Sequence, residues 1–308
     1  MLRRVSAVLA AVWCAILLVA VATPSARAAY PGTNGRVAFV RNGNIFTVRS
    51  DGTGVRQLTT DGRNFAPRWS PDGQRIAFQH ASELWAMRAD GTGKHRVVQG
   101  LKAGRATWSP DGRTLAFNGR PTNEPPAPFA HVYQISSDAV DGTATRLRRY
   151  DPDQQAYVDV FTQNGPIAWS PSGRYLVYEG GECTGIYDNC MTVLDLQTGV
   201  EQTDFAYGGG GSYSGRAYSP DWLPSSAGYL VSERRCIDEA CTGGFQQRLA
   251  LANGSIPNGY NGVYSPSGTR VAYTKNTGST PYVYTATATG GSARRLIQGR
   301  DPDWQPRP

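Results

Sequence analysis

The sequence predicts an all-β protein, a six-bladed β-propeller whose blades are four-stranded antiparallel sheets. Three observations support this fold class. The unit Trp69-Ser70-Pro71-Asp72-Gly73 recurs along the chain in altered copies, at spacings typical of propeller repeats. Strand-like segments and tight turns alternate between the copies. The last copy is cut short by the end of the chain, so it can supply one strand to an otherwise incomplete blade.

The recurring unit has the pattern of a hairpin corner. Pro71 presets the backbone for the first central position of a type I turn, and Gly73 accepts the positive φ that follows. The segment Arg75-Ile76-Ala77-Phe78 then continues as a strand. Trp69, just before the turn, is a large ring that a sheet face can bury. We therefore expect each copy to join the two innermost strands of one blade.

The aromatic residue that opens each copy is called the anchor here. The six anchors are Trp69, Trp108, Trp169, Tyr218, Tyr264 and Trp304. Their spacings are 39, 61, 49, 46 and 40 residues. Six anchors predict six blades.

One blade is expected to draw on both ends of the chain. Residues 36–58 show three strands and the turn Asp51-Gly52-Thr53-Gly54, but no anchor precedes them. Residues 301–305 carry an anchor with almost nothing behind it. We expect this C-terminal strand to be the innermost strand of the N-terminal blade, which closes the ring without a free edge.

The W-S-P-D-G-x-x-I-A-F unit, with its downstream D-G-T-G turn, resembles the propeller repeat of the TolB-like family. Five copies are recognisable, and they span nearly all of the chain after its first 28 residues. The resemblance covers the propeller part only, because TolB proteins carry a separate α/β domain ahead of it. It implies a rigid exported platform for contact with a protein or ligand. The repeat also resembles the propellers that precede prolyl-oligopeptidase-type hydrolases.

The first 28 residues have the features of a secretory signal peptide. Arg3 and Arg4 precede the apolar run Val5–Val21, and Ala26-Arg27-Ala28 offers a cleavage site. We expect cleavage after Ala28, a single propeller domain over residues 29–308, and a secreted, periplasmic or cell-envelope location. An uncleaved membrane anchor is the alternative, because the run is nearly long enough to span a bilayer.

The charge pattern does not favour a nucleic-acid partner. The chain has a formal net charge of +7, which falls to about +4 without Arg3, Arg4 and Arg27. The remaining positive residues are scattered rather than grouped in a basic run, as on an ordinary solvated surface. We expect a monomer with no stable membrane insertion after cleavage.

Four cysteines remain after cleavage, as two close pairs: Cys183 with Cys190, and Cys236 with Cys241. An exported protein meets oxidising conditions, so we expect two local disulfides. Neither pair has the C-x-x-C spacing of common zinc sites, which makes metal binding by the four thiolates the less favoured alternative.

Loop lengths indicate which face binds. The turns that follow the innermost and third strands are short, whereas the connections on the opposite face are long: 119–130, 149–164, 180–189, 207–215, 233–244 and 253–261. Propellers usually bind on the elaborated face. Aromatic residues in these loops are candidates for an interface: Phe129, Tyr157, Tyr187, Tyr207, Tyr213 and Tyr260.

The innermost strands start from the elaborated face, so the polar residues just before each anchor are expected to ring the channel mouth. These candidate ligand-binding residues are Asn64, Arg105, Asn164, Arg216, Asn261 and Asp301. Such a ring suits an anionic group or a peptide carbonyl. The alternative is a water-filled channel in which these side chains only satisfy strand ends.

Two functions remain open. The favoured one is a non-catalytic exported scaffold that binds a protein or cell-envelope ligand, without a cofactor. No catalytic residues are assigned, because the three histidines are dispersed and no G-x-S-x-G motif is present. The alternative is a metal-dependent lactonase or ester hydrolase with a divalent ion in the channel, near Asp301, Asp303 or the Asp151-Pro152-Asp153 segment.

Overall fold

The structure, a computed structural model, describes residues 31–125, 127–163, 165–208, 214–238 and 242–307. The predicted signal peptide lies outside these ranges, as do Asn164, Tyr213 and Cys241.

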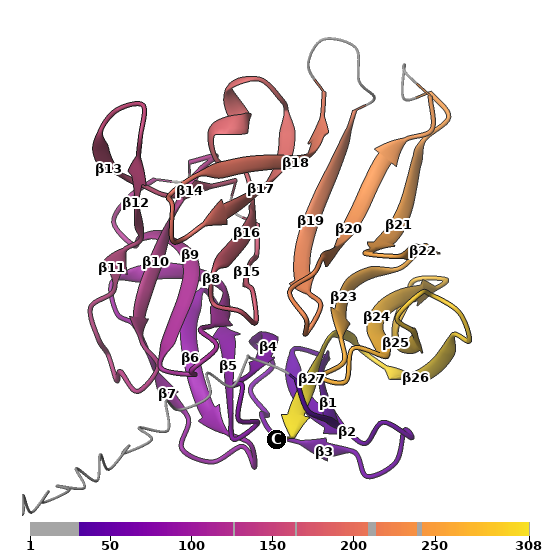
Figure 1. Ribbon diagram of the computed structural model, residues 1–308. Coiled ribbons are helices and arrows are strands. Elements are labelled where there is room, and N and C mark those ends of the chain that lie inside the picture. Colours follow the sequence, from indigo (N-terminus) through magenta and orange to yellow (C-terminus); the bar gives the residue numbers. More distant parts are fainter. Residues whose placement is uncertain (1–30, 126, 164, 209–213, 239–241, 308) are drawn as a thin grey trace, which may run out of the picture.

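Six antiparallel sheets surround a central axis, as predicted (Figure 1). Each sheet is one blade, and its strands are given from the centre outward. Blade one comprises β27 (Arg300–Arg307), β1 (Thr33–Arg41), β2 (Asn44–Val48) and β3 (Arg56–Gln57). Blade two comprises β4 (Asn64–Trp69), β5 (Arg75–His80), β6 (Glu83–Arg88) and β7 (His95–Arg96). Blade three comprises β8 (Leu101–Trp108), β9 (Thr114–Pro121), β10 (Ala130–Ser136) and β11 (Thr145–Arg146).

The remaining three blades follow the same plan. Blade four comprises β15 (Ile167–Trp169), β16 (Tyr175–Glu179), β17 (Asn189–Asp195) and β18 (Glu201–Tyr207). Blade five comprises β19 (Gly215–Trp222), β20 (Tyr229–Cys236), β21 (Phe245–Leu251) and β22 (Gly254–Pro257). Blade six comprises β23 (Tyr260–Tyr264), β24 (Arg270–Thr277), β25 (Thr280–Thr287) and β26 (Arg294–Gln298).

The ring closes through blade one. Strand β27, from the C-terminal end, pairs antiparallel with β1, and Trp304 lies opposite Val37. This confirms the predicted closure and removes a free inner edge from the ring.

The hydrophobic core lies between blades. Six buried clusters are present among the described residues, one at each junction of neighbouring blades. At the junction of blades one and two, for example, Ile45 packs in the same cluster as Trp69 and Phe78. Successive side chains of a strand point to opposite faces, so the inner strands are apolar at consecutive positions and both faces of a blade are buried against its neighbours.

The turn of the recurring unit forms as predicted. Gly73 has a φ of 67°, and its N–H donates to the carbonyl oxygen of Ser70 at 2.8 Å. The Ser70 hydroxyl accepts the N–H of Arg75 at 2.9 Å and contacts the carboxylate of Asp72. The polar residues of the unit therefore serve the turn itself.

The anchor predicted for blade five was wrong. The turn lies at 223–228, where Leu223 N–H donates to Gly228 O and Ser226 N–H donates to Leu223 O, both at 2.8 Å. Trp222, rather than Tyr218, therefore occupies the anchor position. The Ser219-Pro220-Asp221 triplet imitates the turn sequence but lies within β19. The order Trp-x-Pro, shared with Trp69 and Pro71, was the better signal.

The expected long connections are only partly irregular. Within 149–164 the chain forms a separate two-stranded sheet of β12 (Arg148–Asp151) and β13 (Ala156–Asp159). Strand β14 (Phe161–Thr162) then pairs with β10. A short 3₁₀ helix, η1 (Glu182–Gly185), lies between β16 and β17. The predicted insertion 253–261 was mostly wrong, because it contains β22 and the first residues of β23.

Candidate functional site

The mouth of the central channel holds a cavity of about 390 Å³. It lies where the innermost strands begin, which is the face that carries the long connections. Twelve residues line it: Phe65, Ala66, Gln79, Gly104, Arg105, Asn118, Pro166, Ser219, Tyr260, Asn261, Arg300 and Asp301.

All six blades contribute to the cavity through one equivalent position. Once Trp222 is the anchor of blade five, the residue three positions before each anchor lines the cavity. These six residues are Ala66, Arg105, Pro166, Ser219, Asn261 and Asp301. The propeller symmetry therefore brings residues far apart in sequence into one ring.

The strand backbone is irregular at this ring. The pairing of β4 with β5 shifts between Phe65 and Arg68, and similar shifts occur in β8, β19, β23 and β27. Four non-glycine residues of the ring have positive φ, at 49° for Ala66, 51° for Ser219, 47° for Asn261 and 52° for Asp301. Such bulges redirect side chains and are concentrated near binding sites.

Arg105 is the chemically distinctive residue of the ring. Its side chain lines the cavity, yet the residue is only 7% exposed. Its Nε and Nη2 atoms are buried and have no hydrogen-bond partner among the described residues. Burial, followed by repulsion from Arg68, lowers the pKa of Arg105 to about 10. The guanidinium is therefore charged at neutral pH, although no described residue accepts a hydrogen bond from its Nε or Nη2.

Below the mouth, a buried ionic cluster crosses the channel. Arg68 Nη1 donates to Asp303 Oδ1 at 2.8 Å, and Arg68 Nη2 donates to Asp221 Oδ1 at 3.2 Å. Burial raises the pKa of Asp221 to about 6, and it also raises the pKa of Asp303. The charge of Arg68 is thus shared by two carboxylates, unlike that of Arg105.

The same carboxylates fix neighbouring blades together. Asp303 Oδ2 accepts the backbone N–H of Trp69 at 2.6 Å, and Asp221 Oδ2 accepts that of Tyr264 at 2.8 Å. In the same way, the Thr107 hydroxyl oxygen accepts the backbone N–H of Trp169 at 3.0 Å. In three blades, the side chain of the residue before the anchor therefore binds the backbone of an adjacent blade. The two carboxylates of the ionic cluster thus have a structural role in the ring.

The structure brings together three of the six predicted mouth residues. Arg105, Asn261 and Asp301 line one cavity, and Asn261 Nδ2 donates to Asp301 Oδ1 at 2.6 Å. Asn64 is buried away from it and bonds to Asp61. Arg216 instead pairs with Glu179, at 2.6 and 2.9 Å. Asn164 lies outside the described residues.

The other lining residues, except the aromatic candidate Tyr260, were not predicted from the sequence. Ala66, Pro166 and Ser219 became recognisable only by counting three positions back from the correct anchors. Gln79 and Asn118 lie on second strands, which the search for residues before each anchor did not cover.

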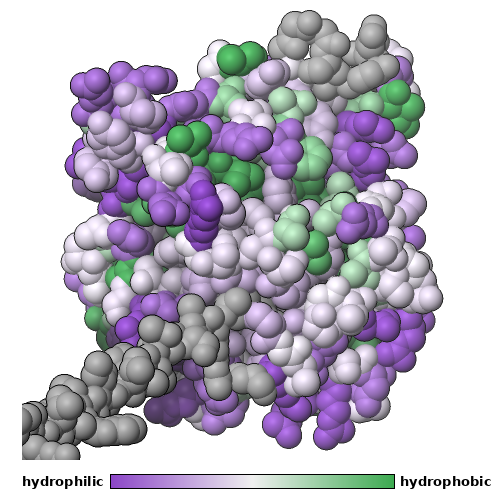
Figure 2. Space-filling model, viewed as in Figure 1, coloured by the Kyte–Doolittle hydropathy of each residue, from purple (hydrophilic) through white to green (hydrophobic). Residues whose placement is uncertain are grey.

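A second cavity, of about 520 Å³, lies between the β12–β13 hairpin and blade four. Phe129, Val158 and Phe161 form part of its lining, together with Arg149 and Glu182. Phe129 and Phe161 are 43% and 45% exposed. Figure 2 shows hydrophobic side chains gathered in the upper half of the view, where β14 and β17–β20 lie in Figure 1.

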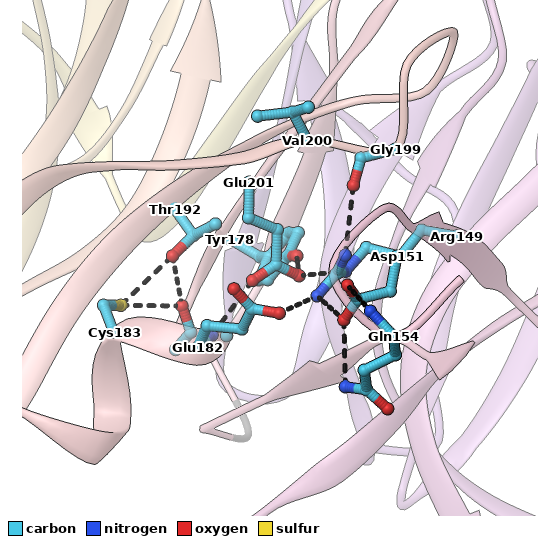
Figure 3. A network of polar contacts seen from close by, with 12 residues as sticks. Arg149, Asp151, Gln154, Tyr178, Glu182, Cys183, Thr192, Gly199, Val200 and Glu201 are labelled. Atoms are coloured by element: carbon cyan, nitrogen blue, oxygen red, sulfur yellow. Dashed lines mark hydrogen bonds and ion pairs between the residues drawn. The ribbon is translucent and has the colours of Figure 1, made fainter. Parts of the chain in front are cut away.

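The polar part of this second cavity is a closed network centred on Arg149 (Figure 3). Arg149 donates to the carbonyl oxygen of Gly199 at 3.2 Å and pairs with Glu201 at 3.2 Å and with Glu182. Asp151 lies 3.5 Å from the same guanidinium. All three nitrogens of Arg149 therefore have partners, which contrasts with Arg105.

The aromatic interface candidates have different environments. Phe129 and Tyr157 are exposed, the latter by 62%. Tyr207 is buried and its hydroxyl donates to Glu233 at 2.7 Å, so it packs within the blade instead. Tyr260 lines the channel mouth.

The predicted Cys183–Cys190 disulfide is present. It links η1 to the start of β17, beside the second cavity. Cys236 is disulfide-bonded as well, while Cys241, its predicted partner, lies outside the described residues.

The described ranges hold no candidate metal centre and no candidate membrane-spanning helix. Within them, no group of three or more His, Cys, Asp or Glu side chains is placed to hold a metal ion. No helix there has the length and apolar character needed to cross a bilayer.

Comparison with solved structures places the chain in a structural class. It superimposes on TolB from Acinetobacter baumannii with a TM-score of 0.60 and 15% identity, over 89% of this chain and 67% of that one. The superposition on a putative TolB from Agrobacterium tumefaciens has a TM-score of 0.56 and 18% identity, and it covers 88% of this chain and 92% of that one. The superposition on an oligogalacturonate lyase in complex with manganese has a TM-score of 0.50 and 12% identity, and it covers 83% of this chain and 70% of that one.

The fold and the ring of mouth residues thus define a six-bladed β-propeller with a polar channel mouth. More particularly, the chain is a TolB-like propeller in fold. No protein-family model matches the sequence, and no curated protein matches it.

Proposed function

We propose that this chain is an exported, non-catalytic scaffold that binds a protein or cell-envelope ligand through the face with the long connections. The channel mouth is the proposed binding site. The protein acts as a monomer without stable membrane insertion and without a cofactor.

The convergence of all six blades on one cavity carries this proposal. Each blade supplies the residue three positions before its anchor, and four of these residues adopt positive φ without being glycine. Such backbone conformations cost free energy, about 1 kcal/mol or more each. A ring that only had to close the propeller would not need them, whereas a ring that presents side chains to a ligand does.

Export is supported by the N-terminal sequence pattern and by the disulfide. Arg3, Arg4 and the apolar run Val5–Val21 have the composition of a signal peptide. The Cys183–Cys190 disulfide suits an oxidising compartment. The location we propose is secreted, periplasmic or at the cell envelope.

Filling the mouth tests the proposal. Ala66→Trp places a large side chain in the cavity, and Gln74→Trp places the same side chain on the opposite face, in an exposed turn. Immobilised protein would be exposed to a cell-envelope extract, and captured components identified by mass spectrometry. We expect the wild type and Gln74→Trp to retain the same component, and Ala66→Trp to lose it.

Thermal unfolding of the three proteins serves as the folding control. Equal capture by a folded Ala66→Trp variant would contradict the mouth as the binding site. Capture lost by both tryptophan variants would point to a general effect of the added side chain and would contradict it as well.

A metal-dependent hydrolase of the lactonase or ester-hydrolase kind is the second candidate. It is favoured by one observation, the structural similarity to an oligogalacturonate lyase in complex with manganese. Metal content of the purified protein, measured by mass spectrometry before and after mild chelation, separates the two. A stoichiometric ion whose removal leaves the fold intact would favour the enzyme, whereas the scaffold proposal expects no such ion.

A further inference from the structure

We propose that the channel mouth recognises a peptide carboxylate and that Arg105 is the residue that binds it. This inference rests on the proposed function, because it names the chemical group that the mouth would accept from a protein partner. It does not use the second cavity, whose central guanidinium already has partners.

The unsatisfied donors of Arg105 are the first step of the argument. A guanidinium loses its hydration when it is buried, and this cost is offset only if its N–H groups find acceptors. Arg105 is 7% exposed, and its Nε and Nη2 have none among the described residues. The Nε and Nη2 N–H groups of arginine form a fork that matches the two oxygens of a carboxylate. A carboxylate in the cavity would therefore supply the two missing acceptors.

The surrounding charges favour a single negative charge over a phosphate dianion. Arg68, below Arg105, is already shared by Asp221 and Asp303. At the rim, the Arg300 guanidinium lies 3.7 Å from the carboxylate of Asp301. Among the described lining residues, Arg105 is thus the cation without a direct carboxylate partner. A dianion would carry more negative charge than this one guanidinium can balance. Three carboxylates also face Arg105 from β19 and β27, and they would repel a dianion more strongly than a monoanion.

A neighbouring group points to a peptide as the source of the carboxylate. Asn118, across from Arg105 on β9, has a buried Oδ1 that no described residue hydrogen-bonds. An N–H beside the carboxylate would satisfy this acceptor, and a peptide provides such a pair at its C-terminus or at an acidic residue. The cavity of about 390 Å³ accommodates one or two residues.

Four small probes test the inference by isothermal titration calorimetry with the purified protein. N-acetylglutamate N-methylamide presents a side-chain carboxylate, and N-acetyl-Ala-Ala presents a terminal one. N-acetylglutamine N-methylamide is the neutral control, and inorganic phosphate is the dianion control. We expect one or both carboxylate probes to bind at least tenfold more tightly than the neutral probe and the phosphate. The tighter carboxylate identifies its source.

Two arginine variants make the assignment specific. Arg105→Gln should lower the affinity of the protein for the carboxylate probe at least tenfold. Arg216→Gln is the matched control, because Arg216 pairs with Glu179 outside the cavity. The affinity of this variant for the carboxylate probe should stay within twofold of that of the wild type. Tighter binding of phosphate, or equal binding by a folded Arg105→Gln variant, would overturn the inference.

The envelope-capture experiment separates this inference from the proposed function. If Ala66→Trp loses the captured component while Arg105→Gln retains it, the mouth binds a partner and the role of Arg105 is wrong. If both variants retain it, the proposed function fails as well.

Discussion

Arg68 on the second blade and Asp303 on the last strand form an ion pair of 2.8 Å between residues 235 positions apart. The same carboxylate accepts the backbone N–H of Trp69. Asp303 belongs to β27 in blade one, and its side chain bonds to two groups of blade two. It therefore connects the two blades. The closure of the ring depends on this contact in addition to the pairing of β27 with β1.

Asp303→Asn should therefore destabilise the protein. The change removes one carboxylate from the buried Arg68, and loss of one partner of a buried pair costs about 3 kcal/mol. Asp138→Asn is the matched control, because Asp138 also pairs with an arginine but its side chain is 83% exposed. We expect the control to change the free energy of unfolding by less than about 1 kcal/mol. Urea denaturation measures both, and equal effects would contradict the structural role of Asp303.

Trp222 should contribute more to stability than Tyr218. Trp222 is buried and its indole N–H donates to Ala168 O at 3.0 Å, as that of Trp108 does to Arg68 O. Trp222→Ala should therefore cost about 3 to 5 kcal/mol in the free energy of unfolding. Tyr218→Ala is the comparison, and it should cost clearly less. The reverse order would place the anchor of blade five at Tyr218.

Removal of the Cys183–Cys190 disulfide should lower stability moderately. It closes a short loop, with a sequence separation of 7 residues, and the chain-entropy model gives about 2 kcal/mol for such a loop. The double variant Cys183→Ala and Cys190→Ala should have a lower melting temperature than the wild type. An unchanged melting temperature would show that the crosslink does not constrain the unfolded chain.

Asp221 should make a pH-dependent contribution to stability. It is surrounded by Arg68, Asp303 and Arg105, and burial raises its pKa to about 6, above its value in the unfolded chain. The folded state therefore binds this proton more tightly, so the contribution of Asp221 is most favourable below about pH 4 and declines as the pH rises to about 6. The shift corresponds to at most about 3 kcal/mol.

Comparison with Asp221→Asn isolates this contribution. Denaturation would be measured for both proteins between pH 4 and pH 7. We expect the stability of the wild type relative to the variant to fall as the pH rises through this range. A relative stability that rises with pH would mean that Arg68 lowers the pKa of Asp221 more than burial raises it.

The fold was predictable because the turn chemistry is local. Pro71 and Gly73 set the corner of the hairpin within a few residues, and the repeat of this pattern specified six blades. The error at Tyr218 arose from the same source, because Ser219-Pro220-Asp221 has the local composition of a turn but is held in a bulged strand by pairing with β20.

The site was predictable only in part because its geometry depends on register. The bulges of the innermost strands decide which residue points into the mouth, and one position changes the direction of a side chain. Arg105, Asn261 and Asp301 were predicted correctly as lining residues. Arg216 lies two residues before the misplaced anchor and pairs with Glu179 instead. That Arg105 Nε and Nη2 find no acceptor in the part of the chain that the structure describes depends on strands from other blades, and no local pattern indicates it.

The melting temperature of Arg105→Met, compared with that of the wild type in ligand-free buffer, tests the central claim most directly. If Arg105 is held for a ligand, replacing it by an apolar side chain of similar length removes two buried N–H donors that have no acceptor among the described residues. The variant should then melt at a higher temperature than the wild type and no longer bind the carboxylate probe. A variant that melts at a lower temperature would show that Arg105 stabilises the channel itself, and this result would contradict the claim.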